Sequence, residues 1–283
     1  MNGYARKPFV RYSFAVVALL LTLSPQIASC AEDPPTLIQQ GFHSMYNLDF
    51  SKATQDFDEW EKLHPQDPMG PVAHAAALLF SEFHRLGVLE TQLFVDDKSY
   101  ETRKKLDPDP TIKEEFEHQL SVGDQLSAAA LIKNASDTNA LFAKVLSLGL
   151  RSDYAALIEK RDLAALSYTK QGRESADQLL KEDPNAYDAY IALGVENYLT
   201  GIKAAPIRWF LQLGGMSTDK NQGIQQLQKA ADHGVLLAPF AKLLLAVAAF
   251  RDKDTAKGCT LLRELATNYP KNPLYTKELW RCH

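Results

Sequence analysis

Apolar residues recur at the three-to-four-residue spacing of a helix face through much of the chain. In "SKATQDFDEWEKLHPQDP", Ala53 lies four residues before Phe57, and Pro65 lies eight residues after it. A helix that packs closely on an antiparallel neighbour needs a small residue at the crossing and a large residue one turn later, and proline ends it. Leu37 and Gly41, which precede Ala53, would let the partner helix approach. No alternating strand pattern of useful length occurs, so the sequence predicts an all-α fold.

Later stretches repeat these signals. One apolar-periodic helix ends before Pro184, and another stretch ends at Pro270. Between them, "GIQQLQKAADHG" has the same apolar spacing, and its last glycine is typical of a helix C-cap. The residues that carry the repeated pattern are Tyr190, Leu193 and Gly194, then Ile224, Leu227, Ala231 and Gly234, then Gly258, Leu262 and Leu265.

The array from Leu37 to Pro65 resembles the tetratricopeptide repeat (TPR), a helix-turn-helix unit of 34 residues. Two positions depart from its pattern, since Ser44 replaces an aromatic residue of the first helix and Trp60 replaces a small residue of the second. The resemblance implies a TPR-like α-solenoid of stacked antiparallel helix pairs. In such a stack, neighbouring units bury the apolar face that a single hairpin leaves exposed.

This interpretation divides the chain into a first TPR unit at residues 34–67, an irregular helical insert at 68–135 and TPR-like helical repeats at 136–283. The insert has apolar residues at helical spacing but is broken at Asp107-Pro108-Asp109-Pro110, because a residue before proline disfavours the helical conformation. Thr111 is predicted to cap the helix that follows, with Glu114 as its capping-box partner.

A second resemblance covers roughly residues 187–280. The stretch "YLTGIKAAPIRWFLQLGGMSTDKNQGIQQLQKAADHG" is similar to a helix-turn-helix segment of the inclusion-body clearance family and its animal TPR relatives. The features that match are Pro206, the run from Trp209 to Leu211, the pair Gly214-Gly215 and Gly223. This similarity implies the same helical-repeat fold and brings no catalytic residues with it.

First helices line the concave groove of a TPR solenoid, where this architecture generally binds its partners. Glu196 and Asn197 place a polar pair inside an otherwise apolar first helix. They are predicted either to hydrogen-bond the backbone of a bound peptide or to satisfy helix ends and loops of the neighbouring unit. The resemblance gives, as exposed groove positions, Ile38, Phe42 and Met45 in the first unit and Asp188, Ile191, Val195 and Tyr198 in the unit that begins at Tyr187.

Composition and motifs argue against several other classes of function. The net charge is −4, and no basic cluster interleaved with aromatic residues appears, which argues against a nucleic-acid partner. The sequence has no nucleophile elbow, phosphate-binding loop or dinucleotide fingerprint. Its seven histidines are scattered without a paired metal-ligand spacing. We therefore expect no cofactor and no metal ion; an enzyme with Glu196 as acid or base near His233 is the alternative from another class.

The N-terminal segment has the pattern of a secretory signal peptide. Basic residues up to Arg11 precede an apolar run from Phe14 to Leu23, and the polar sequence Ser24-Pro25-Gln26 ends that run. A membrane-spanning helix needs about 20 apolar residues, and this run is too short. The pattern predicts that residues 1–30 direct export to the periplasm.

The end of this segment allows two kinds of processing. Ile27-Ala28-Ser29-Cys30 resembles the bacterial lipobox, in which the cysteine is lipidated and becomes the new N-terminus. Ser29-Cys30-Ala31 also fits the small-x-small pattern of ordinary signal peptidase. The protein is therefore expected either to be attached to a membrane through a lipid on Cys30 or to be freely soluble after export.

Two further cysteines remain near the C-terminus. Cys259 lies about as far before the turn near Pro270 as Cys282 lies after it, which places the two side by side in antiparallel helices. Exported proteins fold where disulfides form. A Cys259–Cys282 disulfide is one prediction; a buried Cys259 with Cys282 in a frayed tail is the other, because equal spacing does not fix the helical phase.

Taken together, the patterns predict an exported, non-enzymatic TPR scaffold of the bacterial cell envelope. It would hold a protein or peptide segment in its concave groove. An alternative is an assembly factor that resembles the TPR lipoprotein of outer-membrane protein insertion, although the insert at residues 68–135 departs from a compact tandem array.

Overall fold

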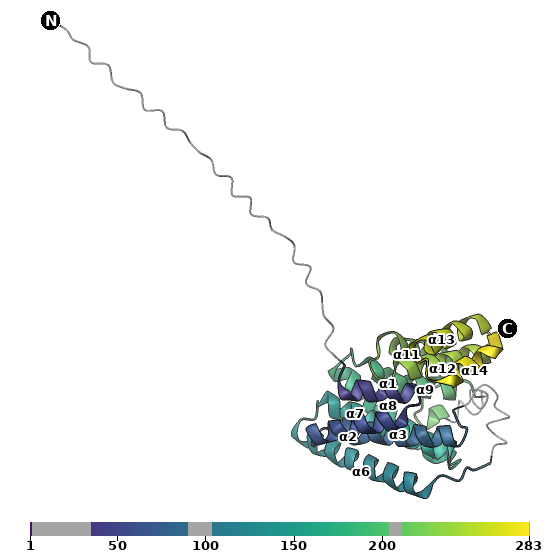
Figure 1. The fold of residues 1–283 in the computed structure, drawn as a ribbon, viewed down its shortest axis with the longest axis horizontal. Helices are drawn as coiled ribbons and strands as arrows, with labels where there is room; N and C mark the ends of the chain where they lie inside the picture. The colour runs from purple at the N-terminus through teal and green to yellow at the C-terminus, as the bar shows by residue number, and fades with distance from the viewer. Residues whose placement is uncertain (2–34, 90–103, 204–210, 283) are drawn as a thin grey trace. The chain divides into compact units, whose positions relative to one another are not determined.

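The fold is all-α over the residues described by the structure, a computed structural model that covers residues 1, 35–89, 104–203 and 211–282 (Figure 1). Each helix packs mainly against the helices before and after it, in a solenoid-like arrangement. Apart from Met1, the predicted signal peptide, with Cys30, lies outside these residues. The helices are α1 (Leu37–Tyr46), α2 (Phe50–Leu63), α3 (Met69–Arg85), α6 (Pro110–Lys133), α7 (Thr138–Leu157), α8 (Asp162–Glu182), α9 (Tyr190–Gly201), α11 (Lys220–His233), α12 (Ala238–Arg251), α13 (Thr255–Asn268) and α14 (Pro273–Glu278), with 3-10 turns η1 (Tyr187–Ala189) and η2 (Leu279–Cys282).

Side-chain caps fix where many of these helices begin. Thr36 and Gln39 form a capping box at α1. At α6, the predicted cap Thr111 is wrong by two residues: Asp109 is the N-cap and accepts hydrogen bonds from the backbone N–H groups of Thr111 and Ile112. Pro110 occupies the first helical position, where a missing N–H costs nothing. Aspartate also caps α2, α7, α11 and α13, through Asp49, Asp137, Asp219 and Asp254.

Small residues lie where helices of a pair cross closely, as the sequence spacing predicted. A methyl group added at Gly41 would come within 2.3 Å of the Phe57 ring, and both Ala53 and Phe57 are fully buried. At the α9–α11 crossing, a methyl group on Gly194 would lie 2.8 Å from the Leu227 side chain. These contacts confirm that the pattern in the first unit marks a close helix–helix contact.

Two glycines inside helices give a matched pair of stability predictions. Gly41→Ala places a methyl group against the Phe57 ring, and overpacking of this kind lowers the free energy of unfolding by about 1–3 kcal/mol. Gly149→Ala in α7 meets no atom within 4 Å and should stabilise the protein by about 1 kcal/mol, because alanine favours helix over glycine. Urea unfolding of both variants checks the opposite signs. A Gly41→Ala variant as stable as the wild type would contradict the close approach.

The segment at 68–135 contains two long helices, α3 and α6, that pack against each other. The connection between them returns to α3 through the Glu82 carboxylate, which is buried and accepts 2.7 Å hydrogen bonds from Arg85 Nε and from the backbone N–H of Asp109. Arg85 and this N–H lower the pKa of Glu82 against the opposing effect of burial. The carboxylate therefore fixes the start of α6 beside the end of α3.

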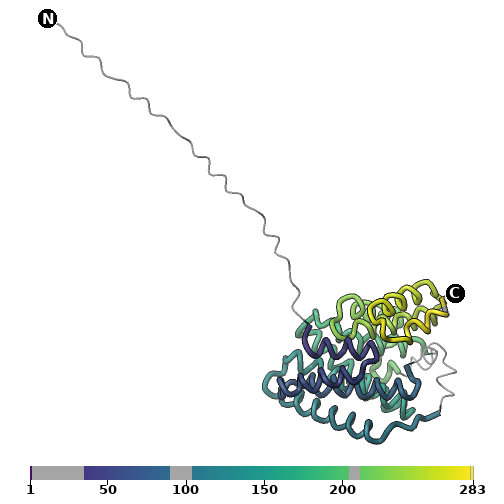
Figure 2. Tube along the Cα trace, viewed as in Figure 1, coloured from purple at the N-terminus to yellow at the C-terminus, as the bar shows by residue number. Residues whose placement is uncertain are grey.

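The first and last helical pairs meet, whereas repeats of an open solenoid contact only their neighbours. The Tyr46 hydroxyl at the end of α1 donates to the carbonyl of Leu236 over 3.0 Å. The Asn272 amide donates to the Tyr46 carbonyl over 2.9 Å, and the N–H of Lys271 donates to the Asn47 side chain over 3.1 Å. In Figure 2, the purple first helix accordingly lies next to the yellow-green C-terminal helices. The two ends of the helical array are therefore joined.

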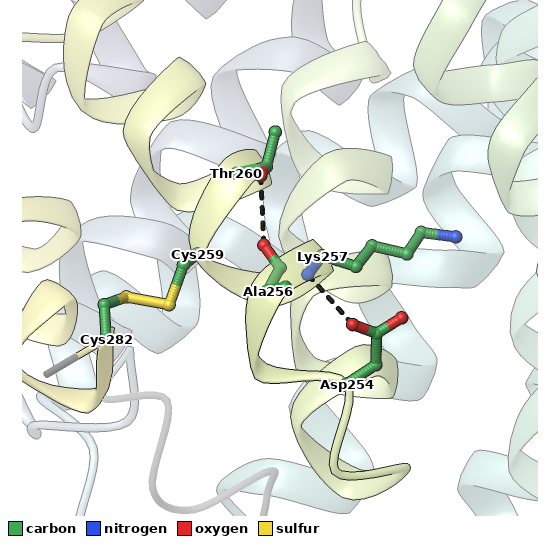
Figure 3. The surroundings of a disulfide bond; sticks show 6 residues. All are labelled: Asp254, Ala256, Lys257, Cys259, Thr260 and Cys282. Atoms are coloured by element: carbon green, nitrogen blue, oxygen red, sulfur yellow. Dashed lines mark hydrogen bonds between the residues drawn. A yellow bond between two sulfur atoms is a disulfide. The ribbon is translucent and has the colours of Figure 1, made fainter.

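A disulfide joins the end of the chain to α13. Cys259 in α13 and Cys282 in η2 have Cα atoms 5.8 Å apart and bonded sulfur atoms (Figure 3). The same view shows Asp254 capping α13 through the N–H of Lys257. The C-terminal helical turn is therefore held on the last hairpin, the arrangement that the first of the two cysteine predictions describes.

In the part of the chain that the structure describes, no helix combines the length and the apolar character needed to span a membrane.

Candidate functional site

An enclosed pocket lies between α1, α3, α7, α8, α9 and the start of α12. Its cavity volume is about 90 Å³, and the atom-free space is about 780 Å³ when the solvent at its open mouth is counted. Phe80 of α3 and Phe240 of α12 form part of its wall and meet edge to face, with ring centroids 5.9 Å apart. The pocket thus exists because the C-terminal helices return to the N-terminal ones.

Four of the seven predicted groove residues line this one pocket. Phe42 and Met45 come from α1, and Ile191 and Val195 come from α9. These residues belong to two units that are far apart in the sequence, and the fold brings them to the same cavity. All except the half-buried Val195 are buried, so the expectation of an exposed groove is wrong for them.

The other three predicted groove residues do not line this pocket. Ile38 and Tyr198 are buried in helix packing. The Asp188 carboxylate accepts hydrogen bonds of 2.9–3.0 Å from the backbone N–H groups of Val235, Leu236 and Leu237, just before α12. Burial raises the pKa of Asp188, although these three hydrogen bonds oppose the change. Asp188 is therefore a structural anchor for the loop before α12 and is not free to bind a partner.

Glu196 and Asn197 hold the connection between α9 and α11, in line with the second of their two predicted roles. Both side chains are fully buried. Glu196 accepts a 2.8 Å hydrogen bond from the N–H of Ser217 and lies 3.4 Å from Arg173. Asn197 donates to Gln226 over 2.8 Å. Burial raises the pKa of Glu196, while Ser217 and Arg173 oppose the change.

Glu196 and His233, the pair of the enzyme alternative, both lie outside the lining of the pocket. The His233 ring instead packs on Tyr187, with ring centroids 4.8 Å apart. The side chain of Glu196 is 0% exposed, so the structure gives it no surface on which to meet a substrate.

Asp153 of α7 is the acidic residue in the pocket lining, and the sequence interpretation missed it. No hydrogen bond or ion pair joins its carboxyl to another described residue. Burial alone raises its pKa to about 7. The signal was present, because Asp153 continues the four-residue spacing of Val145 and Gly149 on the pocket-facing side of α7. An ionised carboxyl at a helix position that otherwise faces apolar residues is costly unless it is paired or hydrogen-bonded.

Hydroxyl groups form the remaining polar part of the lining. The Ser152 and Thr169 hydroxyls lie 2.9 Å apart, and both lie within hydrogen-bond distance of the carbonyl of Ala165. With one proton each, they donate two of these three bonds at a time. Tyr168 and Tyr46 contribute phenol groups. A raised carboxyl pKa is typical of a general acid. However, the lining has no imidazole, thiol or second carboxyl to act with Asp153. One carboxyl and several hydroxyls are therefore the side-chain polar groups that the described lining offers.

A wider and more polar hollow borders the other side of α1. Gln39, His43, Lys52 and the half-exposed loop residue Leu236 contribute to it, and Phe42 borders both hollows. Its buried carboxylate, Asp56, is already paired with Lys52. The charge in this hollow is therefore balanced within the protein, unlike the charge on Asp153.

One group of described residues has the donor atoms that a divalent metal ion takes. His74 Nδ1 of α3 lies 3.2 Å from the Asp58 carboxylate and 3.3 Å from the Glu61 carboxylate, both on α2. Burial would lower the pKa of His74, but Glu61 and Asp58 outweigh it and the pKa is raised. A protonated histidine between two carboxylates explains this geometry by itself. Sequence spacing missed the group because its members belong to two helices.

Comparison with known proteins adds no family assignment. No protein-family model matches the chain, and no curated protein sequence matches it significantly, so the enclosed pocket and its single acidic residue remain the basis for any functional interpretation.

Proposed function

We propose that this chain is an exported, non-enzymatic TPR-like scaffold that binds a segment of a partner protein by holding one of its side chains in the enclosed pocket. The observation that carries the proposal is the convergence of first-helix residues from two distant units, Phe42 and Met45 with Ile191 and Val195, on one cavity. Concave, mostly apolar cavities with a few polar groups are the usual form of binding sites.

Two features support export to the bacterial cell envelope as the setting. The N-terminal pattern is that of a signal peptide, with a lipobox-like end at Cys30 that would attach the protein to a membrane. The Cys259–Cys282 disulfide is of the kind that forms outside the reducing cytosol. An assembly factor of the outer-membrane type is one specific form of this proposal.

Site-specific photo-crosslinking in cells tests the proposal. A p-azidophenylalanine in place of Tyr168 keeps an aromatic ring at the pocket and should capture the partner there. The matched control is the same residue at Leu163, which lies on the same helix but is 85% exposed outside the pocket. Gly149→Leu, which fills open space in the pocket, should abolish the Tyr168 adduct.

Circular dichroism of the Gly149→Leu variant shows whether the fold is retained. Equal cross-linking from both positions, no adduct from either, or an adduct that persists after a folded Gly149→Leu variant fills the pocket would contradict the proposal.

A further inference from the structure

The pocket carries a negative group without a counter-charge. Among the residues that line it, Asp153 is the acidic one, and no lysine, arginine or histidine is present. The remaining lining is apolar apart from hydroxyl groups. An ionised carboxylate in such surroundings is costly unless a cation pairs with it. Asp153 is therefore a carboxyl that a positively charged ligand can pair with, at a cavity that is open to a ligand.

Three basic side chains of α7 and α8 are engaged elsewhere. Arg151 of α7 binds Asp124 over 2.6 Å. Lys170 of α8 donates to the carbonyl of Gly214 over 2.8 Å. Arg173 of α8 lies 3.3 Å from Asp177 and 3.4 Å from Glu196.

Three basic side chains on other helices around the pocket also lie away from Asp153. His74 of α3 pairs with Asp58 and Glu61. Lys242 of α12 pairs with Glu264. His43 of α1 borders the second hollow and is absent from the pocket lining. No described residue of the lining therefore supplies Asp153 with a cation, and a ligand can.

The shape and chemistry of the pocket favour one kind of cation. A lysine side chain buries its aliphatic stem along apolar surface and keeps a compact ammonium at its end. The ammonium has three donors, and the lining offers as acceptors the Asp153 carboxylate and the hydroxyls of Tyr168 and Thr169. A guanidinium spreads its charge over a rigid plane, whereas the cavity volume is about 90 Å³, so the compact ammonium fits it better. Gly149 leaves the wall beside Asp153 open.

We propose that the pocket binds a lysine side chain of the partner segment, with its stem among Phe42, Met45, Leu146 and Ile191 and its ammonium at Asp153. This inference rests on the proposed function and deepens it, because it names the residue type that the scaffold recognises. Burial holds the pKa of Asp153 at about 7 in the free protein, so the bound ammonium would also shift this carboxyl toward its ionised form.

Titration of the full chain with blocked amino acids, followed by NMR, tests the inference. The probes are N-acetyl-lysine-N′-methylamide, the norleucine analogue that lacks the charge, and the Nε-acetyl-lysine analogue. At pH 8, the lysine probe should bind the wild type at least tenfold more tightly than either neutral analogue. Asp153→Asn should remove that preference, and Gly149→Leu should weaken binding of every probe. Asp232→Asn, at an exposed carboxyl, is the matched control and should bind like the wild type.

Each other outcome overturns the inference in a recognisable way. Equal binding of the lysine and norleucine probes, or a lysine preference that survives in Asp153→Asn, excludes recognition by this carboxyl. If free butylamine binds as tightly as the lysine probe, the occupant is a small amine and not a partner's side chain. If the Tyr168 cross-link forms and Gly149→Leu abolishes it, but the titration shows no preference for lysine, the proposed scaffold function stands and only this inference is overturned.

Discussion

Replacing Asp153 by asparagine should raise the free energy of unfolding at pH 8, by up to about 4 kcal/mol. The carboxyl lines an apolar pocket without a charged partner, and burial raises its pKa to about 7. The unfolded chain releases the same proton near pH 3.9. The folded state therefore holds this proton more tightly than the unfolded chain does. The stability that the protonated carboxyl contributes is fully present below about pH 4, and it is lost as the pH rises through about 7. An uncharged amide avoids that loss.

Urea unfolding of the wild type and of Asp153→Asn between pH 4 and pH 8 measures the effect. The difference between the two should grow with pH and level off above about pH 7. The pKa of His74 is also raised, so its contribution to stability is lost as the pH rises through that pKa. Both proteins keep His74, so the difference in unfolding free energy between them reports on Asp153. Asp232→Asn serves as the control and should follow the wild type. Parallel curves for wild type and Asp153→Asn would show that the carboxyl is solvated.

Local rules in the sequence predicted the parts of the fold that depend on neighbouring residues. The spacing of Gly41, Ala53 and Phe57 encodes a single helix crossing, and that crossing is present because each member contacts residues nearby in the chain. The error at Thr111 was also local. Asp109 and Thr111 flank Pro110, and both are acceptable N-cap residues. The preference of proline for the first helical position favours Asp109.

The enclosed pocket could not be predicted in the same way, because it depends on contacts between residues about 190 and 226 positions apart. Tyr46 bonds Leu236 and Asn272, and these contacts join two parts of the chain that an open solenoid would keep apart. A residue at a groove position, such as Ile191, then becomes part of a cavity wall. The role of Asp188 could not be predicted for the same reason, because only the fold brings the loop before α12 to its carboxylate.

Removing the disulfide by Cys282→Ser should lower the free energy of unfolding by about 3 kcal/mol in the chain-entropy model. Cys259 and Cys282 are 23 positions apart, so the bond restricts a loop of moderate length in the unfolded chain. The core of the last hairpin is small: Ala246, Leu262, Leu265 and Tyr275. The bond therefore contributes a large share of the local stability.

The effect should be strongest at the end of the chain. Lys271 and Asn272 in the turn before α14 remain hydrogen-bonded to the end of α1, so the turn should persist while η2 detaches. Hydrogen exchange should accordingly rise first in residues 273–282. A reductant should reproduce the loss in the wild type and leave Cys282→Ser unchanged. Thiol counting on the denatured, unreduced protein with Cys30→Ser gives the decisive control, because two free thiols would mean that the bond does not form.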